Sequence, residues 1–245
     1  MKFGRFAIVC LALLMNCSFA FVNGTDDVFV PEKPLKPKRF CSAAKKWLNY
    51  AKQDSSLVEI SWMKGLKLDL RYATFDNVTG HDLYCGIQRA FMHKDAVPKL
   101  RRAVSILKKE MPGASFLIYD ASRPLYAQEA LRKMVRKTPY SSFVASPGKG
   151  GMHNFGLAVD MTIIDSEGKP LDMGTDFDSF ERCAGSVGEA EALETGRLTQ
   201  KQLDNRNFYR SIMKRAGWTP LNTEWWHFNA YPSKYVREHY EKFPL

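Results

Sequence analysis

The chain has 245 residues, of which 45% are hydrophobic and 25% are charged. This composition excludes a chain that is disordered throughout, and the length suits one domain with a substantial core. The formal net charge of +10 is compatible with an anionic surface nearby. The sequence contains no basic helix interleaved with aromatic residues and no nucleic-acid-binding motif, so we expect no nucleic-acid partner.

Residues 1–20 are predicted to form an export signal. Lys2 and Arg5 precede an apolar run that is too short to span a bilayer, and the segment ends in Ser18-Phe19-Ala20. We therefore expect cleavage after Ala20 and a periplasmic or secreted protein. A lipoprotein anchored at Cys17 is the alternative, disfavoured because Asn16 stands where a small residue is expected. No later segment is long and apolar enough for stable membrane insertion.

Residues 21–40 are predicted to form a linker, and residues 41–245 a single domain. The linker is predicted because Pro31, Pro34 and Pro37 alternate with basic residues, a composition that favours extended, solvated backbone.

Apolar periodicity predicts the elements of the domain. The predicted helices cover 43–53, 95–110, 124–136 and 200–216, and the predicted strands cover 57–60, 67–72, 116–119, 158–164, 171–173 and 225–228. Ser42 is expected to cap the first helix and Gly217 to end the last, with residues 174–199 mostly irregular. Helices mixed with short, hairpin-connected strands indicate an α+β fold, a small and mainly antiparallel sheet flanked by helices.

Three cysteines remain after removal of the predicted signal, at Cys41, Cys85 and Cys183. One disulfide in any of three pairings, with one free thiol, and three buried thiols are both compatible with the sequence. The sequence has no Cys-x-x-Cys motif, which argues against a zinc site made of thiolates.

Two stretches far apart in the sequence carry the residue types of a hydrolytic metal site. His153 and Asp160 stand at the start of an apolar strand, and Glu224-Trp225-Trp226-His227 lies near the C-terminus. A carboxylate inside an apolar strand is costly unless it is paired or bound to a metal. Two imidazoles and one carboxylate suit Zn²⁺ and leave a fourth position for water. We predict one zinc ion per chain, held by His153, Asp160 and His227.

Two further residues complete the predicted chemistry. Glu224 is the predicted general base, which would take a proton from the attacking water and pass it to the leaving amine. Arg123 lies at a predicted strand-to-helix junction and would stabilise the oxyanion of the tetrahedral intermediate. At least one of the two tryptophans, Trp225 or Trp226, is expected to pack in the core.

These motifs resemble those of a known superfamily. The pattern His153-x-x-Gly156-x-Ala158-x-Asp160, with Glu224-Trp225-Trp226-His227, resembles the zinc D-alanyl-D-alanine peptidases, a superfamily that also includes the Hedgehog signalling domain. Three more stretches are similar to the D-alanyl-D-alanine dipeptidases known from vancomycin resistance, namely 72–80, 119–124 and 173–178. The resemblance covers residues 57–245. It implies the same α+β fold, zinc ligands, base and oxyanion residue as above.

The resemblance also implies the substrate. Tyr72 and Asp178 are expected to receive the free amino group of D-alanyl-D-alanine or a similar D-containing dipeptide. A carboxylate that binds an amine favours a free N-terminus and rejects longer peptides, whose nitrogen is uncharged. Gly151 replaces the serine that the family usually has two residues before the first zinc histidine, which leaves the exact dipeptide preference open.

Two alternative functions remain open at this stage. One is a D,D- or L,D-carboxypeptidase acting on peptidoglycan stem peptides, and the other is a non-catalytic peptidoglycan binder. The presence of Glu224 and Arg123 disfavours the binder. An exported enzyme would meet D-alanyl-D-alanine released by wall turnover, so the expected role is wall recycling or nutrition instead of antibiotic resistance.

Overall fold

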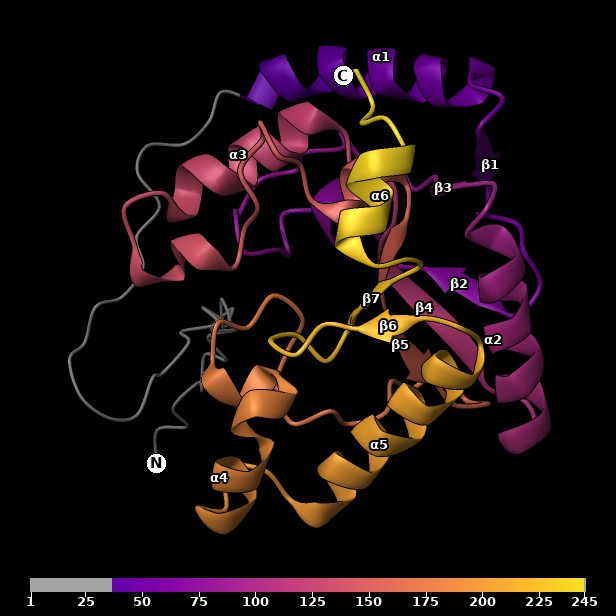
Figure 1. Ribbon diagram of the computed structural model, residues 1–245, viewed down its shortest axis with the longest axis vertical. Helices are drawn as coiled ribbons and strands as arrows, with labels where there is room; N and C mark the ends of the chain where they lie inside the picture. Colours follow the sequence, from indigo (N-terminus) through magenta and orange to yellow (C-terminus); the bar gives the residue numbers. More distant parts are fainter. Residues whose placement is uncertain (1–36, 245) are drawn as a thin grey trace, which may run out of the picture. The chain divides into compact units, whose positions relative to one another are not determined.

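A five-stranded sheet lies at the centre of the computed structural model, which describes residues 37–244 (Figure 1). Its order is β2 (Leu66–Leu68), β4 (Ser115–Asp120), β5 (Ala158–Ile164), β7 (His227–Asn229) and β6 (Thr219–Pro220). β2 runs parallel to β4, and the other neighbouring pairs are antiparallel. A separate antiparallel pair joins β1 (Leu57–Glu59) to β3 (Phe91–His93). The predicted signal and the predicted linker up to residue 36 lie outside the described residues.

Helices surround this sheet (Figure 1). They are α1 (Pro37–Gln53), α2 (Val97–Glu110), α3 (Leu125–Val135), α4 (Glu189–Glu194), α5 (Gln200–Arg215) and α6 (Ser233–His239). α5 packs on the sheet through Tyr209, whose ring contacts Phe116 and Phe228 and whose hydroxyl donates to the Met161 carbonyl. The predicted α+β fold is therefore confirmed. Within this described part, no helix is long and apolar enough to cross a bilayer.

Strand β5 is the structural centre of the sheet. All seven of its residues are buried, because β4 and β7 pair with its edges while apolar side chains cover its faces. The preceding turn depends on Gly156, which has a φ of 67°. A Cβ at this position would lie 2.7 Å from the backbone nitrogen of His93, so only glycine fits without displacing β3. This turn connects the 3₁₀ segment Met152–Phe155 to β5.

The N-terminal helix is longer than predicted. α1 begins at Pro37, so the last four residues of the predicted linker, 37–40, are helical and Ser42 lies inside the helix instead of capping it. Proline is tolerated in the first turn of a helix, where its missing N–H needs no partner. The helix also buries the side chains of Phe40, Ala44, Trp47 and Ala51 along one face. The helix extends into the predicted linker because residues such as Phe40 are buried against the rest of the domain, which the composition of the linker did not reveal.

Three other predictions need correction. The strand predicted over 67–72 ends at Leu68, because the N–H of Leu70 bonds to the Gln88 side chain and a 3₁₀ turn follows at Arg71–Ala73. The predicted return strand 171–173 is reduced to one bridge between Ile164 and Pro170, since proline offers no N–H to a ladder. The last predicted strand, 225–228, is shifted to β7, and helix α6 was not predicted.

A disulfide joins Cys41 of α1 to Cys85 in the loop before β3, 44 positions later in the sequence, and Cys183 is a buried free thiol. This is one of the three pairings that the sequence left open. The bond fastens α1 to the segment that contains Tyr84, whose hydroxyl donates to the buried Asp120.

We predict that reduction of the Cys41–Cys85 disulfide lowers the stability of the protein. Cross-linking a loop of this length restricts the unfolded chain, so the double variant Cys41→Ser/Cys85→Ser should lose roughly 2–4 kcal/mol of unfolding free energy. Thermal unfolding with and without reductant checks this. Cys183→Ser is the control, because its melting temperature should still fall when reductant is added. An unchanged melting temperature of the wild type in reductant would contradict the prediction.

Candidate active site

Cross-strand register brings three of the polar residues together at one end of the sheet. Asp120 on β4 lies opposite Asp160 on β5, and Asp160 lies opposite His227 on β7. His153 joins them from the 3₁₀ segment before β5, where the backbone N–H of Arg123 donates to its carbonyl. All four side chains are buried. Residues from four separate stretches of sequence therefore form one polar cluster.

His153, Asp160 and His227 offer three ligand atoms to a common centre. The distances are 3.1 Å between His153 Nε2 and His227 Nδ1, 2.9 Å between His227 Nδ1 and Asp160 Oδ1, and 3.3 Å between His153 Nε2 and Asp160 Oδ1. Ligand atoms of tetrahedral Zn²⁺ lie roughly 3.3 Å apart when the metal–ligand bonds are about 2.0–2.1 Å. The group has the spacing of a metal site.

The outer ring nitrogens show that this group fits a cation. His153 Nδ1 donates to the Ala121 carbonyl at 2.7 Å, and His227 Nε2 donates to the Asn229 side-chain oxygen at 2.9 Å. Both inner nitrogens therefore present lone pairs, beside a carboxylate oxygen. Three acceptors this close repel one another unless a positive charge lies between them.

Arg123 is held beside the cluster by buried partners. Its Nε donates to Asp120 Oδ2 at 2.7 Å, its Nη1 to Gln128 Oε1 at 3.1 Å, and its Nη2 lies 3.4 Å from Asp160 Oδ2. Asp120 also accepts from the Tyr84 hydroxyl at 2.8 Å. A planar guanidinium clamped in this way keeps one orientation, so its charge is directed at the cluster.

Glu224 lies just outside the three ligand residues. Its Oε2 is 4.0 Å from His227 Nδ1, and its side chain is 15% exposed. Burial raises the pKa of the Glu224 carboxyl to about 7, even though His227 acts in the opposite direction. A carboxyl with a pKa near neutrality can both accept and release a proton, as a general base requires.

Tyr72 and Asp178 form a second polar pair in the same cavity. The Tyr72 hydroxyl lies 2.9 and 3.1 Å from the two oxygens of Asp178. Asp178 has a φ of 61°, a left-handed conformation that is uncommon outside glycine and that often marks functional positions. Burial raises the pKa of the Asp178 carboxyl to about 7, against the opposing effect of Arg123. A cationic ligand would stabilise the charged form of this carboxyl.

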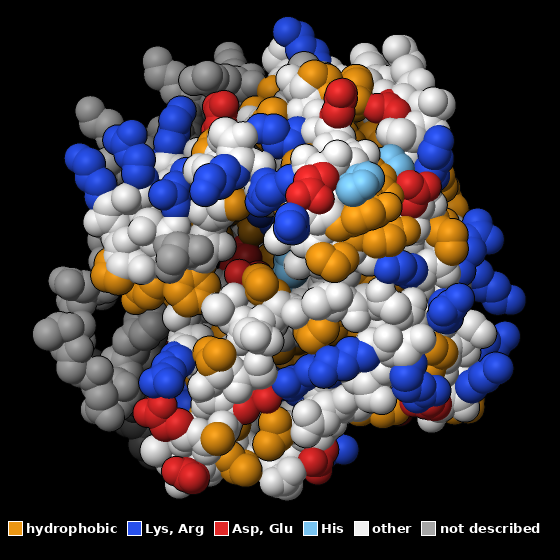
Figure 2. Space-filling view, in the orientation of Figure 1, with side chains coloured by type: hydrophobic (Ala, Val, Ile, Leu, Met, Phe, Trp, Pro, Cys, Tyr) orange, Lys and Arg blue, Asp and Glu red, His pale blue; other side chains and the backbone are white. Residues whose placement is uncertain are grey.

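One cavity of about 270 Å³ is lined by all seven residues that the sequence predicted as site residues. They are Tyr72, Arg123, His153, Asp160, Asp178, Glu224 and His227. Figure 2 shows the hollow near the middle of this face, with acidic and histidine side chains visible inside. Trp226 lines the cavity and is buried, as expected for one of the tryptophans, whereas the Trp225 indole donates to Thr175. The volume suits a ligand of dipeptide size.

The supporting residues were missed by the sequence analysis. Asp120 and Gln128 orient Arg123, and Asn229 fixes the tautomer of His227. A signal existed for two of them. Asn229 is two residues after His227, hence on the same face of a strand, and Asp120 ends the apolar run that precedes Arg123. Gln128 gave no such signal, because its role depends on how α3 packs.

Known proteins match this chain over most of its length. A family model described as D-ala-D-ala dipeptidase (Peptidase_M15) matches residues 54–244. A D-alanyl-D-alanine dipeptidase of Escherichia coli (strain K12) is 32% identical over 163 residues, which is 66% of this chain and 78% of that protein. The D-alanyl-D-alanine dipeptidase of Enterococcus faecium is 26% identical over 198 residues, or 70% of this chain and 91% of that protein. The chain therefore belongs to the D-Ala-D-Ala dipeptidase family of peptidases.

Proposed function

We propose that this protein is a zinc dipeptidase that hydrolyses D-alanyl-D-alanine, or a similar D-containing dipeptide, to free amino acids. The observation that carries the proposal is the convergence of three groups on one cavity. These are the triangle of metal-ligand atoms, the carboxylate of Glu224 and the Tyr72–Asp178 pair. The first two suit hydrolysis, and the third suits a substrate with a free amine.

His153, Asp160 and His227 would hold one zinc ion per chain. When bound, zinc would polarise the scissile carbonyl and lower the pKa of its water ligand towards neutrality. Glu224 Oε2 accepts the proton of the attacking water and then transfers it to the leaving amine nitrogen. The Arg123 guanidinium, kept rigid by Asp120 and Gln128, stabilises the negative charge that develops on the carbonyl oxygen.

Asp178 and Tyr72 bind the substrate's ammonium group. An ammonium beside the Asp178 carboxylate compensates the cost of burying that charge, whereas the uncharged amide of a longer peptide does not. The amine site therefore favours a dipeptidase over a carboxypeptidase that trims stem peptides. A non-catalytic binder is disfavoured because Glu224 and Arg123 both line the same cavity as the ligand triangle.

We further propose that the enzyme works outside the cytoplasm, in the periplasm or as a secreted protein. The apolar segment after Lys2 and Arg5 supports export, and so does the Cys41–Cys85 disulfide, since disulfides persist mainly in oxidising compartments. The substrate would then be dipeptide released by wall turnover, and the role would be recycling or nutrition.

Removal of the metal should abolish activity and lower stability. Chelated, dialysed protein should release no D-alanine from D-alanyl-D-alanine, and one equivalent of Zn²⁺ should restore release. The melting temperature should fall by roughly 5–10 °C, since a ligand at about 100 times its Kd contributes about 2.7 kcal/mol. Amino-acid release and thermal unfolding are the measurements. Full turnover by protein shown to contain no metal would refute the metal mechanism.

Replacement of the proposed base should remove turnover without removing the metal. Glu224→Gln keeps the shape of the side chain but accepts no proton, so kcat should fall roughly 10²–10⁴-fold while zinc content stays at one per chain. Glu194→Gln, on the exposed surface of α4, is the matched control and should behave as wild type. Equal kcat in wild type and Glu224→Gln would show that another group takes the proton.

Replacement of the amine-binding carboxylate should affect only substrates with a free amine. Asp178→Asn should lower kcat/KM for D-alanyl-D-alanine at least tenfold, because the charge that balances the ammonium is lost. The same variant should leave the slow cleavage of N-acetylated dipeptide almost unchanged. Asp176→Asn, two residues away and exposed, is the control. An equal loss on both substrates would mean that Asp178 has no specific role toward the amine.

A further inference from the structure

The cavity contains two arginines, and only one of them has a carboxylate partner. Arg123 is balanced by Asp120 and Asp160. Arg237, on α6, lines the same cavity and is exposed. Its Nη1 and Nη2 donate to the backbone carbonyls of Lys149 and Gly150, which carry no net charge. Across residues 37–244, no ion pair includes Arg237.

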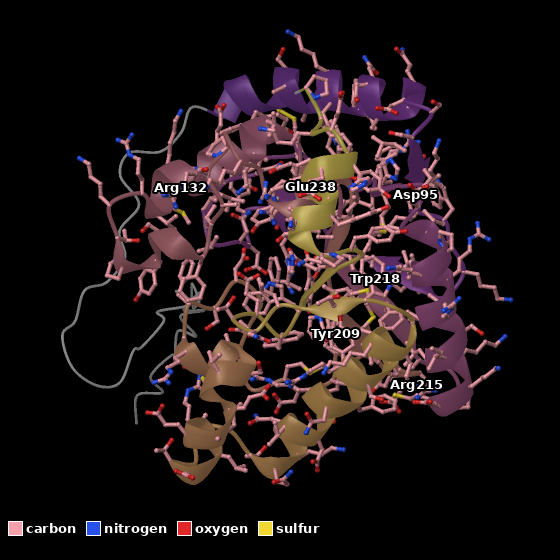
Figure 3. The ribbon with its side chains drawn as sticks, in the orientation of Figure 1. Asp95, Arg132, Tyr209, Arg215, Trp218 and Glu238 are labelled. Atoms are coloured by element: carbon pink, nitrogen blue, oxygen red, sulfur yellow. A yellow bond between two sulfur atoms is a disulfide. The ribbon has the colours of Figure 1, made fainter. Side chains whose placement is uncertain are left out.

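The direction of Arg237 follows from its place on the helix. Ser233 and Arg237 are four residues apart, so they share one face of α6, and both line the cavity. The next residue, Glu238, is exposed on the same helix, where Figure 3 labels it. Successive residues of a helix do not face each other, so Glu238 does not neutralise Arg237.

The two carbonyls hold the guanidinium in place without using all of its donors. An arginine has five N–H groups in a planar fork, and two of them are used by Lys149 and Gly150. Three remain for another acceptor. A guanidinium that is already fixed loses little rotamer freedom when it binds a carboxylate.

A free dipeptide carries an ammonium at one end and a carboxylate at the other. The inference rests on the proposed function, in which the Tyr72–Asp178 pair binds the ammonium end. That proposal assigns no residue to the carboxylate end. We infer that Arg237 binds the C-terminal carboxylate of the substrate. Recognition of both charged ends limits the substrate to two residues, since a further residue at the C-terminus would replace the carboxylate by an uncharged amide.

The test compares a free acid with its amide. D-Alanyl-D-alanine and D-alanyl-D-alaninamide differ in the C-terminal charge, and wild type should prefer the acid. Arg237→Met keeps most of the aliphatic stem but loses the charge, so kcat/KM for the acid should fall about tenfold and kcat/KM for the amide should not change. Arg237→Lys should recover part of the preference. Because Arg237 is exposed, the preference of wild type should also weaken as salt is added.

Lys242 provides a matched control for a purely structural role. Its Nζ donates to the carbonyls of Pro147 and Gly148, so it supports the same turn as Arg237, but it does not line the cavity. Lys242→Met should leave the acid-to-amide ratio at the wild-type value. If Arg237 only supports this turn, Arg237→Met and Lys242→Met will each lower kcat/KM for the acid and for the amide by the same factor. That result would overturn the inference.

A binding measurement separates this inference from the proposed function. In the Glu224→Gln background, calorimetry should show D-alanyl-D-alanine binding about tenfold more weakly when Arg237→Met is added. Equal Kd values in the two variants would overturn the role of Arg237, whereas no binding by Glu224→Gln with Arg237 intact would overturn the proposed substrate. If turnover depends on Glu224 but Arg237→Met has the same acid-to-amide ratio of kcat/KM as wild type, this inference alone is overturned. Absence of turnover in zinc-loaded wild type would instead overturn the proposed function.

Discussion

The mutual repulsion of three buried acceptor atoms is the constraint on which the rest of the site depends. His153 Nε2, Asp160 Oδ1 and His227 Nδ1 lie within 3.3 Å of one another in a setting with little solvent. A cation among the three atoms would relieve this repulsion, and neighbouring groups prevent the ligands from turning away. The Ala121 carbonyl and the Asn229 side chain do this for the histidines, and pairing with β4 and β7 does it for Asp160. The sheet therefore fixes the positions of the ligands before any metal binds.

The same cavity is lined by charged groups of both signs. Asp178 offers a carboxylate at one part of the wall, Arg237 offers an uncompensated cation at another, and Glu224 lies next to the ligand atoms. Arg123 is different, because Asp120 and Asp160 balance its charge and limit its motion. An arginine restrained by partners is suited to a transition-state charge that appears in a fixed place, whereas one with free donors is suited to a charge already present on the substrate.

Helix α1 lies before the residues that match the family model, yet it contacts the segments that support the site. α1 ends at Gln53, and the residues matched by the dipeptidase family model begin at position 54. The helix nonetheless buries four apolar side chains and is bonded through Cys41 to Cys85. Cys85 follows Tyr84, which donates to Asp120, which in turn holds Arg123. The disulfide is thus three contacts away from the arginine of the proposed mechanism.

Local patterns in the sequence were sufficient for the elements whose burial is periodic. Strand β5 and helices α2, α3 and α5 lie within three residues of their predicted bounds, because apolar spacing is a local property of the chain. The residue types of the site and their grouping in one cavity were also predicted, since few arrangements of His, Asp and Glu serve hydrolysis. The start of α1, the existence of α6, the Cys41–Cys85 pairing and the supporting roles of Asp120, Gln128 and Asn229 were decided by the tertiary structure. Each depends on contacts between segments far apart in the sequence, and no spacing within one segment encodes which distant partner it will meet.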